Sequence, residues 1–475
     1  MEKTLARNAA YNIAYRLLNV IFPLFSATYV ARALTPDGVG RVAYAQNIMS
    51  FFLMVAALGI PQYGMREIAR RQNCLQAKNV LFSELLVVNG ISTIICIIAY
   101  YLFIWIMAPK DAVLYAVFGL ELFLNLINID WFYQGEEEYV YITRRSILVK
   151  GLSLLALFLF VKEQCDYVLY ALIISAGTGC NHFFNIYHAR KRISFTFRGL
   201  NIGQHLKPVV VLLAGTLVAS LYNRVDVTML GWISTKASVG YYTNAHKVVS
   251  IVLGLVTAIS AVFFPRLSYA YQNDRKAYHA YVTNGLKIVL LLAIPGCLGL
   301  ILTAEVMTTV LFGAEFAPAA TTIQILAVFT IVKGGGDILC YQAVVSSGNE
   351  NKLITSRIFA GIANVLFNAL LIPRFSHNGA AVASVISELI VNGMLLRYAL
   401  TITRPAVDKR FYGSLLLSSV GMGIAVLLVR GLTGNALLNL FLSVVTGIMV
   451  FSILMVLTGN EMARTVISKI KIQRE

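Results

Sequence analysis

Apolar stretches of about 20 residues recur fourteen times along the sequence, and they constrain the fold more than any other feature. A helix of about 20 apolar residues crosses the hydrocarbon core of a bilayer. Charged residues make up only 13% of the 475 residues, whereas soluble domains contain about 25%. We therefore predict an all-α polytopic membrane protein with about 14 transmembrane helices. The predicted spans are 13–33, 42–61, 80–107, 112–133, 147–161, 167–187, 209–233, 241–264, 288–310, 320–344, 353–372, 379–399, 412–429 and 437–458.

Basic residues are distributed unevenly between the two sets of loops. Twenty-eight Lys and Arg residues lie in loops on the side of the termini, and six lie in the opposite loops. Because cytoplasmic loops carry the basic excess, both termini are predicted to be cytoplasmic. The same asymmetry accounts for most of the net charge of +17, so no nucleic-acid partner is expected. The N-terminal 30 residues have a long apolar region without a small-residue cleavage site, which predicts a retained first span.

Two segments of the sequence resemble each other at an offset of 200 residues. Residues 35–73 align with residues 235–273 without gaps, and nine of the 39 positions are identical. Six predicted spans separate the two segments, an even number that gives both the same orientation in the membrane. This predicts a parallel repeat about an axis along the membrane normal, an arrangement used by transporters. We expect two six-helix lobes, 1–208 and 209–402, followed by two further helices and a cytoplasmic tail at 403–475.

Motifs for catalysis, nucleotide binding and metal binding are absent from the sequence. It contains no GxxxxGK[ST] and no HExxH, and its six cysteines form no CxxC pair. No cofactor or metal is therefore expected, and the short outward loops leave little room for a catalytic domain. The run KGGGD at 333–337 is expected to be a flexible break in the tenth span. Backbone groups exposed by such a break are tolerated only where they contact protein or line a cavity.

Charged residues within the spans are the candidates for a binding site, since an unpaired charge there costs at least about 2.5–3.5 kcal/mol. Arg16 and Arg32 lie near span ends and could line a cavity or anchor at the interface. Arg224, Lys247 and Lys333 have less opportunity to reach the interface. The acidic candidates, each a partner for a cation or a site of ion coupling, are Glu121, Asp130, Asp226, Asp337 and Glu388.

Arg224 and Asp226 are two positions apart in one span. On a continuous helix they point about 200° apart, so they do not neutralise each other. Arg224 either faces a substrate or pairs with an acid such as Asp130 or Glu388. Asp226 either pairs with a neighbouring helix or takes part in cation or proton coupling. Guanidinium and ammonium groups bind phosphate well. These cations therefore fit a transported molecule that has an anionic phosphate group and a long lipid tail.

Several longer stretches resemble the Wzx-type polysaccharide-export flippases. They are RNAAYNIAYRLLNVIFPLFSATYVARALTPDGVGRVAYAQNIMSFF, INIDWFYQGEEEYVYITRRS, SLYNRVDVTMLGWISTKASVGYYTNAHKVV followed by FFPRLS, and VLFGAEFAPAATTIQILAV. Their order covers nearly the whole chain. This family belongs with lipid II flippases and multidrug extruders in one superfamily of two-lobed transporters.

The resemblance implies a non-enzymatic flippase in the bacterial cytoplasmic membrane. Its cargo would be an undecaprenyl-diphosphate-linked oligosaccharide for O-antigen or a similar surface polysaccharide, moved from the inner to the outer leaflet by alternating access. It also implies a cationic cavity, with Arg16 and Arg224 in the positions typical of such cations. The protein would act as a monomer among membrane lipids, and a polysaccharide polymerase and glycosyltransferases are conceivable partners.

Three alternatives stay open. An ion-coupled multidrug antiporter would favour carboxylates in its cavity, whereas cations prevail among the candidates here. A lipid II flippase is typically richer in arginine over its first two spans than this chain. A membrane glycosyltransferase, polymerase or ligase usually needs a large outer loop with catalytic residues, and no loop of that size is predicted.

Overall fold

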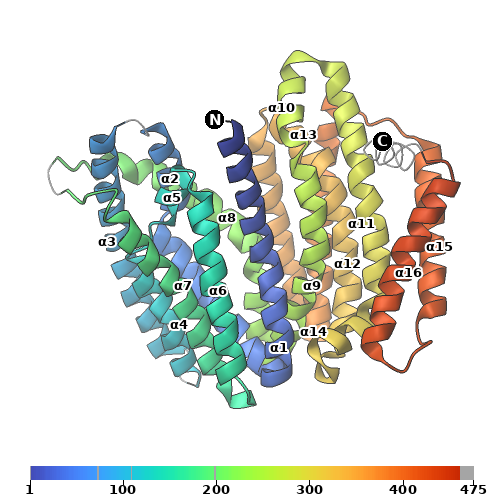
Figure 1. The fold of residues 1–475 in the computed structure, drawn as a ribbon, viewed down its shortest axis with the longest axis horizontal. Helices are drawn as coiled ribbons and strands as arrows, with labels where there is room; N and C mark the ends of the chain where they lie inside the picture. The colour runs from blue at the N-terminus through green and yellow to red at the C-terminus, as the bar shows by residue number, and fades with distance from the viewer. Residues whose placement is uncertain (1, 72–73, 108–109, 197–198, 461–475) are drawn as a thin grey trace. The chain divides into compact units, whose positions relative to one another are not determined.

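The computed structural model describes residues 2–71, 74–107, 110–196 and 199–460, with the side chains of residues 2–21 and 221 left aside. These residues form helices and connecting turns and no strand, which confirms the all-helical prediction within the described ranges (Figure 1). The chain divides into two compact units, residues 1–240 and 241–475, which are described separately. The three-part division expected at 208/209 and 402/403 stays a prediction.

Unit 1 contains eight helices and the beginning of a ninth. They are α1 (Glu2–Ala57), α2 (Ile60–Arg70), α3 (Leu75–Met107), α4 (Ala112–Asn125), α5 (Asp130–Gly135), α6 (Tyr139–Phe160), α7 (Tyr167–Ala189), α8 (Gly203–Ile233) and the start of α9 (Lys236–Ala261), with the short 3₁₀ turn η1 (Gln164–Asp166). Its apolar core lies where α2, α3 and α5 meet and includes Ile68, Leu85 and Tyr133, which are fully buried.

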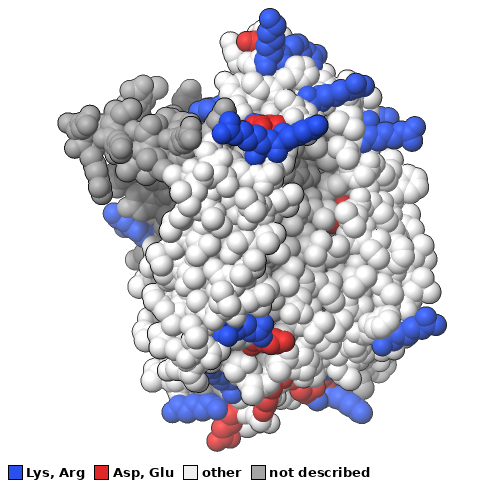
Figure 2. Space-filling model, turned by 90° about the vertical axis from the view of Figure 1, so that its right-hand side faces the viewer, with Lys and Arg blue, Asp and Glu red and all other residues white. Residues whose placement is uncertain are grey.

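Unit 2 continues α9 and adds seven further helices. They are α10 (Phe264–Asn273), α11 (Arg275–Phe312), α12 (Ala319–Gly336), α13 (Ala343–Ser346), α14 (Glu350–Ile402), α15 (Lys409–Val429) and α16 (Ala436–Leu457), with the short turns η2 (Ala314–Phe316) and η3 (Asp337–Gln342). Tyr278, Val289 and Ile338 are completely buried in its core. On the face that Figure 2 shows, charged side chains gather toward two opposite edges, and the band between them is uncharged apart from a small acidic area.

The number of separate spans differs from the prediction. Eight helices in the described residues are long and apolar enough to cross a membrane, or nine if the bent helix α8 is included. Two predicted pairs of spans form continuous helices: α1 is interrupted only at Thr35 (φ 61°) and α14 only at Ser376 (φ 52°). Proline lies beside each interruption, at Pro36 and Pro373. A single kinked residue therefore replaces the loop that the sequence suggests.

The glycines at the start of the two repeat segments pack reciprocally within unit 1. A side chain on Gly40 would overlap the backbone carbonyl of Lys236, and a side chain on Gly240 would overlap the carbonyl of Pro36. Gly40 and Gly240 are repeat equivalents, and so are Pro36 and Lys236. A contact in which each member repeats the other's role is what a two-fold relation produces. The Lys236 ammonium also lies 3.4 Å from the centre of the Tyr44 ring. This cation–π contact further stabilises the packing of the two segments.

The glycine run before Asp337 is not a break, so that expectation was wrong. Helix α12 continues through Gly336 and passes directly into a π-helical turn, η3. A side chain at Gly336 would overlap the amide of Asn392, whose Nδ2 donates to the Val332 carbonyl at 3.0 Å. Gly336 therefore allows α14 to pack closely on α12. A π-turn inside a helix often accompanies a functional site.

An ion pair at the loop before α15 joins the last two helices, α15 and α16, to the rest of unit 2. The Lys287 ammonium of α11 donates to Asp408 Oδ2 at 2.6 Å, and Asp408 Oδ1 accepts from the Phe411 backbone N–H at 3.0 Å. These two contacts hold the pKa of the half-buried Asp408 carboxyl below its usual value. The carboxylate therefore caps the first turn of α15 and links it to α11.

Candidate functional site

Arg224 lies on α8, and hydroxyl and amide groups of α1 hold it on one side. Its Nη1 donates to Ser50 Oγ at 2.9 Å, and Asn47 Nδ2 donates to Thr228 Oγ1 at 2.7 Å, one turn along α8. The guanidinium is exposed, and no carboxylate in the described part of unit 1 lies within ion-pair distance of it. Asp130 pairs with Arg145 instead. A pairing of Arg224 with Glu388, which belongs to unit 2, stays a prediction. Within unit 1 the Arg224 charge is available to an anion.

Asp226 is buried on the same helix, with 5% of its surface exposed. Arg224, two positions earlier, is exposed. The two side chains thus have different surroundings, as helical geometry requires of residues two positions apart. Asp226 belongs to the interior of the unit, whereas Arg224 belongs to its surface.

In unit 2 the two lysines of the candidate set have different neighbours. Lys247 Nζ on α9 donates to Asn244 Oδ1 at 3.1 Å. Lys333 Nζ on α12 lies 4.0 Å from Glu388 Oε2 of α14 and 5.0 Å from the centre of the Phe329 ring. Glu388 is buried, so the Lys333 ammonium offsets part of the cost of burying its charge.

The remaining acids sit in polar clusters. Asp337, at the π-turn, accepts from the Ser260 hydroxyl of α9 and from Gln342 Nε2 at 3.1 Å. Glu121 of α4 is buried and accepts from the Ser175 hydroxyl of α7 at 3.2 Å. These partners of the two carboxyls are hydroxyl and amide groups.

The two candidates of the first span are Arg32 and Arg16. Arg32 is exposed on α1. The side chain of Arg16 lies outside the described residues. A cavity role for either arginine stays a prediction.

Sequence reasoning missed a second group of charges in unit 1. Arg145 of α6 donates to Asp130 Oδ1 at 3.1 Å and to the Asn185 amide oxygen, and its side chain is only 5% exposed. The sequence had placed Arg145 among loop cations, because it lies before the apolar part of its span. Likewise Glu84 pairs with His205 at 2.7 Å, and both are buried. Partners so distant in sequence leave no signal in a single chain.

Comparison with known proteins identifies the family. Residues 5–270, more than half of the chain, match the family Polysaccharide biosynthesis protein, and residues 152–447 match Lipid II flippase MurJ. The chain belongs to the polysaccharide biosynthesis protein family. It is therefore a multi-pass membrane protein in a family of transporters, not enzymes.

Relatives of this family member agree with that assignment over most of its length. A protein named Putative O-antigen transporter from Escherichia coli (strain K12) is 23% identical over 401 residues, 83% of this chain and 96% of its own. Among solved structures, Lipid II flippase MurJ in an inward closed conformation has a TM-score of 0.77 at 16% identity, covering 97% of this chain and 100% of its own. An inward-facing multidrug resistance MATE family transporter of the MOP superfamily has a TM-score of 0.64 at 15% identity, covering 83% and 98%. The polysaccharide biosynthesis protein described here therefore has a MurJ/MATE-like fold.

Proposed function

We propose that this protein is a flippase for a lipid-linked oligosaccharide, and that Arg224 binds the phosphate of its cargo. The supporting observation is an exposed guanidinium that is anchored on a hydroxyl and has no carboxylate partner in the described part of unit 1. Arg224 stays charged throughout the physiological pH range and can form two parallel hydrogen bonds to phosphate oxygens. An apolar tail would remain in the lipid while the diphosphate and sugars pass through the protein.

Lys247 supplies a second cation in this account. It occupies the position equivalent to Asn47 in the repeat and is oriented by Asn244. An ammonium is a compact charge with three rotatable donors, so it can follow a phosphate or a sugar acid as the cargo moves. Arg224 and Lys247 thus provide one anion contact in each unit.

The finer form of the proposal specifies cargo, direction and membrane. The cargo is an undecaprenyl-diphosphate-linked repeat unit, moved from the inner to the outer leaflet of the bacterial cytoplasmic membrane, with both termini in the cytoplasm. The relative named as an O-antigen transporter supports the class of cargo. A diphosphate with about two negative charges gains roughly 4–5 kcal/mol on outward transfer across an inside-negative potential of about 100 mV. The potential alone can therefore favour export, and ion exchange would add to it.

Lipid II is the second candidate cargo. The match of residues 152–447 to the lipid II flippase family and the similarity to a MurJ structure favour it. Lipid II also carries a diphosphate, so Arg224 would serve the same role. Complementation distinguishes the two cargoes: rescue of cells depleted of their lipid II flippase would favour lipid II, and rescue of surface polysaccharide alone would favour the repeat unit.

The test of the proposal is complementation of a strain that lacks this protein. The deletion is expected to abolish the surface polysaccharide, and Arg224→Ala is expected to restore less than a tenth of the wild-type amount. Arg404→Ala removes an exposed arginine from the loop before α15 and serves as the matched control. Normal polysaccharide in the deletion strain, or full rescue by Arg224→Ala at equal protein level, would refute the proposal.

A further inference from the structure

A cavity of about 640 Å³ opens on the surface of unit 1 where α5 and α7 end and α6 begins. Its volume lies within the range of sites for small ligands. Arginines, glutamates, aromatic residues and aliphatic residues line it together. The lining residues are Glu136, Glu137, Glu138, Val140, Tyr141, Arg144, Arg145, Leu148, Phe184, His188 and Arg192.

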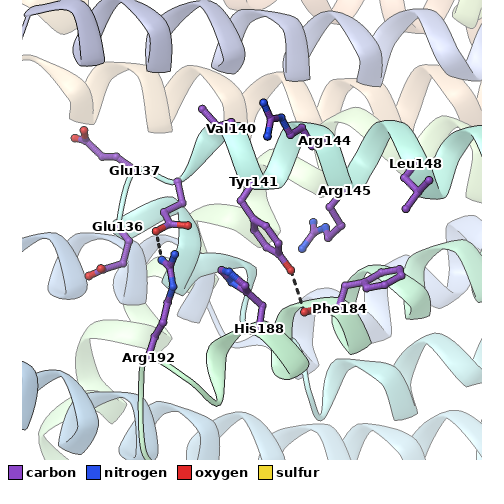
Figure 3. A pocket seen from close by; sticks show the side chains of 11 residues that line it. Glu136, Glu137, Val140, Tyr141, Arg144, Arg145, Leu148, Phe184, His188 and Arg192 are labelled. Atoms are coloured by element: carbon purple, nitrogen blue, oxygen red, sulfur yellow. Dashed lines mark hydrogen bonds and ion pairs between the residues drawn. The ribbon is translucent and has the colours of Figure 1, made fainter.

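The lining changes from charged to apolar along one direction. Figure 3 shows Glu136, Glu137 and Arg192 at one end of the cavity and Leu148 and Phe184 at the other, with the two α6 arginines between. Exposed side chains on α6 remain apolar beyond Leu148, at Leu152 (56%) and Leu155 (58%). The cavity therefore spans the level at which unit 1 passes from a polar to an apolar surface.

Most of the charges in the lining are already paired within the protein. Glu136 lies 2.8 Å from the Lys78 ammonium, Glu138 pairs with Arg192, and Arg145 pairs with Asp130. In the described residues, two lining charges have no ion-pair partner. They are Glu137, at the charged end, and Arg144, nearer the apolar end, and both are exposed.

Another part of the cavity lining is firmly held. The Tyr141 ring stacks on the His188 ring with 4.3 Å between centroids, and the Tyr141 hydroxyl donates to the Phe184 carbonyl at 2.9 Å (Figure 3). His188 Nδ1 also lies 3.0 Å from the Tyr133 hydroxyl. A preformed wall lowers the entropic cost of binding a ligand.

We infer that this cavity binds the headgroup of a phospholipid that carries a primary amine, such as phosphatidylethanolamine. From the charged end inward, the cavity presents a free carboxylate, a free guanidinium and an apolar surface. A phospholipid of this class presents an ammonium, a phosphate and acyl chains in the same order. Glu137 accepts from the ammonium, Arg144 donates to the phosphate, and the chains lie along Leu148 and Leu152.

The order of the charges sets the lipid specificity. A quaternary ammonium has no N–H to donate to Glu137, so a choline headgroup would lose that hydrogen bond. A purely anionic headgroup has no ammonium to donate to Glu137, and it would place its hydroxyls or charge beside that free carboxylate. This site is separate from Arg224 and does not depend on the cargo proposed above.

Binding of defined lipids to the full-length protein tests the inference. Phosphatidylethanolamine, phosphatidylcholine and phosphatidylglycerol with identical acyl chains are titrated into the detergent-purified protein, and the bound fractions are measured by native mass spectrometry. Wild type is expected to bind the ethanolamine lipid about tenfold more tightly than the other two. Glu137→Gln should remove the preference over phosphatidylcholine, and Arg144→Gln should weaken the binding of all three lipids.

Arg404→Gln is the matched control, because it removes an exposed arginine far along the sequence from the cavity. It should leave the ranking of the lipids unchanged. Equal binding of the three lipids by wild type, or a preference for phosphatidylglycerol, would overturn the inference whether or not the variants fold. Variants that fold and bind the ethanolamine lipid as wild type does would overturn it as well.

Discussion

The part of α1 that follows Thr35 is equivalent to helix α9 in the repeat. The two segments differ in the polar side chains that they carry. Both begin with a glycine that contacts the other segment, at Gly40 and Gly240. Further along, Asn47 and Ser50 of α1 hold a cation that belongs to α8. On α9 the position equivalent to Asn47 is Lys247, which is itself the cation.

The comparison separates what the repeat retains from what it changes. The close backbone approach is retained on both sides, because any side chain there would overlap a carbonyl group. The source of the positive charge differs: α8 supplies it in unit 1, and α9 supplies it in unit 2. We infer that the glycine contact maintains the fold, whereas the polar positions along the two helices are adapted to the cargo.

The largest expected effect follows from breaking the shared glycine contact. Gly40→Leu forces a side chain into the carbonyl of Lys236, so the two segments must separate. Overpacking of this kind costs about 1–3 kcal/mol or more, and we expect a marked loss of folded protein in the membrane. Gly240→Leu should have a similar effect, since its contact with Pro36 is reciprocal. Detergent-solubilised yield and the midpoint of thermal unfolding measure both changes.

Gly90 provides the control for that prediction. It lies in α3, and a side chain there would meet no other group within 4 Å. Gly90→Leu should be tolerated, because the helical interior favours leucine over glycine. Wild-type stability of Gly40→Leu would show that the reciprocal contact does not constrain the fold.

The next effect concerns the two cations. Arg224→Ala should lower transport at least tenfold with little loss of folded protein, because the guanidinium is exposed. Lys247→Ala should lower it less, since a point charge makes fewer directed contacts with phosphate. Arg224→Lys should recover part of the activity by retaining the charge. The amount of surface polysaccharide per folded protein molecule measures all three effects. Equal losses from Arg224→Ala and Lys247→Ala would contradict the expected difference between the cations of the two units.

A smaller effect is expected at the Lys333–Glu388 ion pair in unit 2. Arg224 has no such acidic partner in the described part of unit 1. Lys333→Met leaves the buried Glu388 carboxylate without its ammonium neighbour, whereas Glu388→Gln removes the charge itself. The double variant should therefore be more stable than the sum of the single changes predicts, by about 1 kcal/mol. Thermal unfolding of the four proteins gives this coupling energy. A value of zero would mean that the 4.0 Å separation has no energetic consequence.

The smallest effect is expected at the anchor of Arg224. Ser50→Ala removes one hydrogen bond to a guanidinium that remains partly solvated, so transport should fall about two- to threefold. Ser250→Ala, the repeat equivalent, should have no effect on transport through Arg224, because Ser250 contacts His246 on its own helix. A larger loss from Ser250→Ala than from Ser50→Ala would contradict the proposed division of roles.

The sequence was a good guide to the helices because apolar length and charge avoidance are local properties. Most residues of the predicted spans are helical within the described ranges, although turns interrupt the predicted spans 42–61, 112–133 and 241–264. The kinks at Thr35 and Ser376 were not predictable from apolar windows, since one residue with positive φ replaces the expected loop. The glycine run at 334–336 gave a wrong expectation for a related reason: close packing, against Val256 at Gly334 and against Asn392 at Gly336, accounts for two of the three glycines.

Sequence reasoning located the charges but not most of their partners. Helical geometry separated Arg224 from Asp226 correctly, because both lie on one helix. The pairs Arg145–Asp130 and Lys333–Glu388 join residues 15 and 55 positions apart on different helices, and their formation depends on how those helices pack. The cavity beside α6 depends on three chain segments at once, so it could not be predicted from one sequence.

Transfer of a labelled lipid in proteoliposomes tests the central claim most directly. The purified full-length protein is reconstituted with a fluorescent undecaprenyl-diphosphate oligosaccharide, and the appearance of label in the opposite leaflet is followed with a membrane-impermeant quencher under an imposed potential. The account predicts transfer well above that of protein-free vesicles, at least tenfold slower with Arg224→Ala and unchanged with Arg404→Ala. No transfer by wild type, or equal rates for wild type and Arg224→Ala, would contradict it.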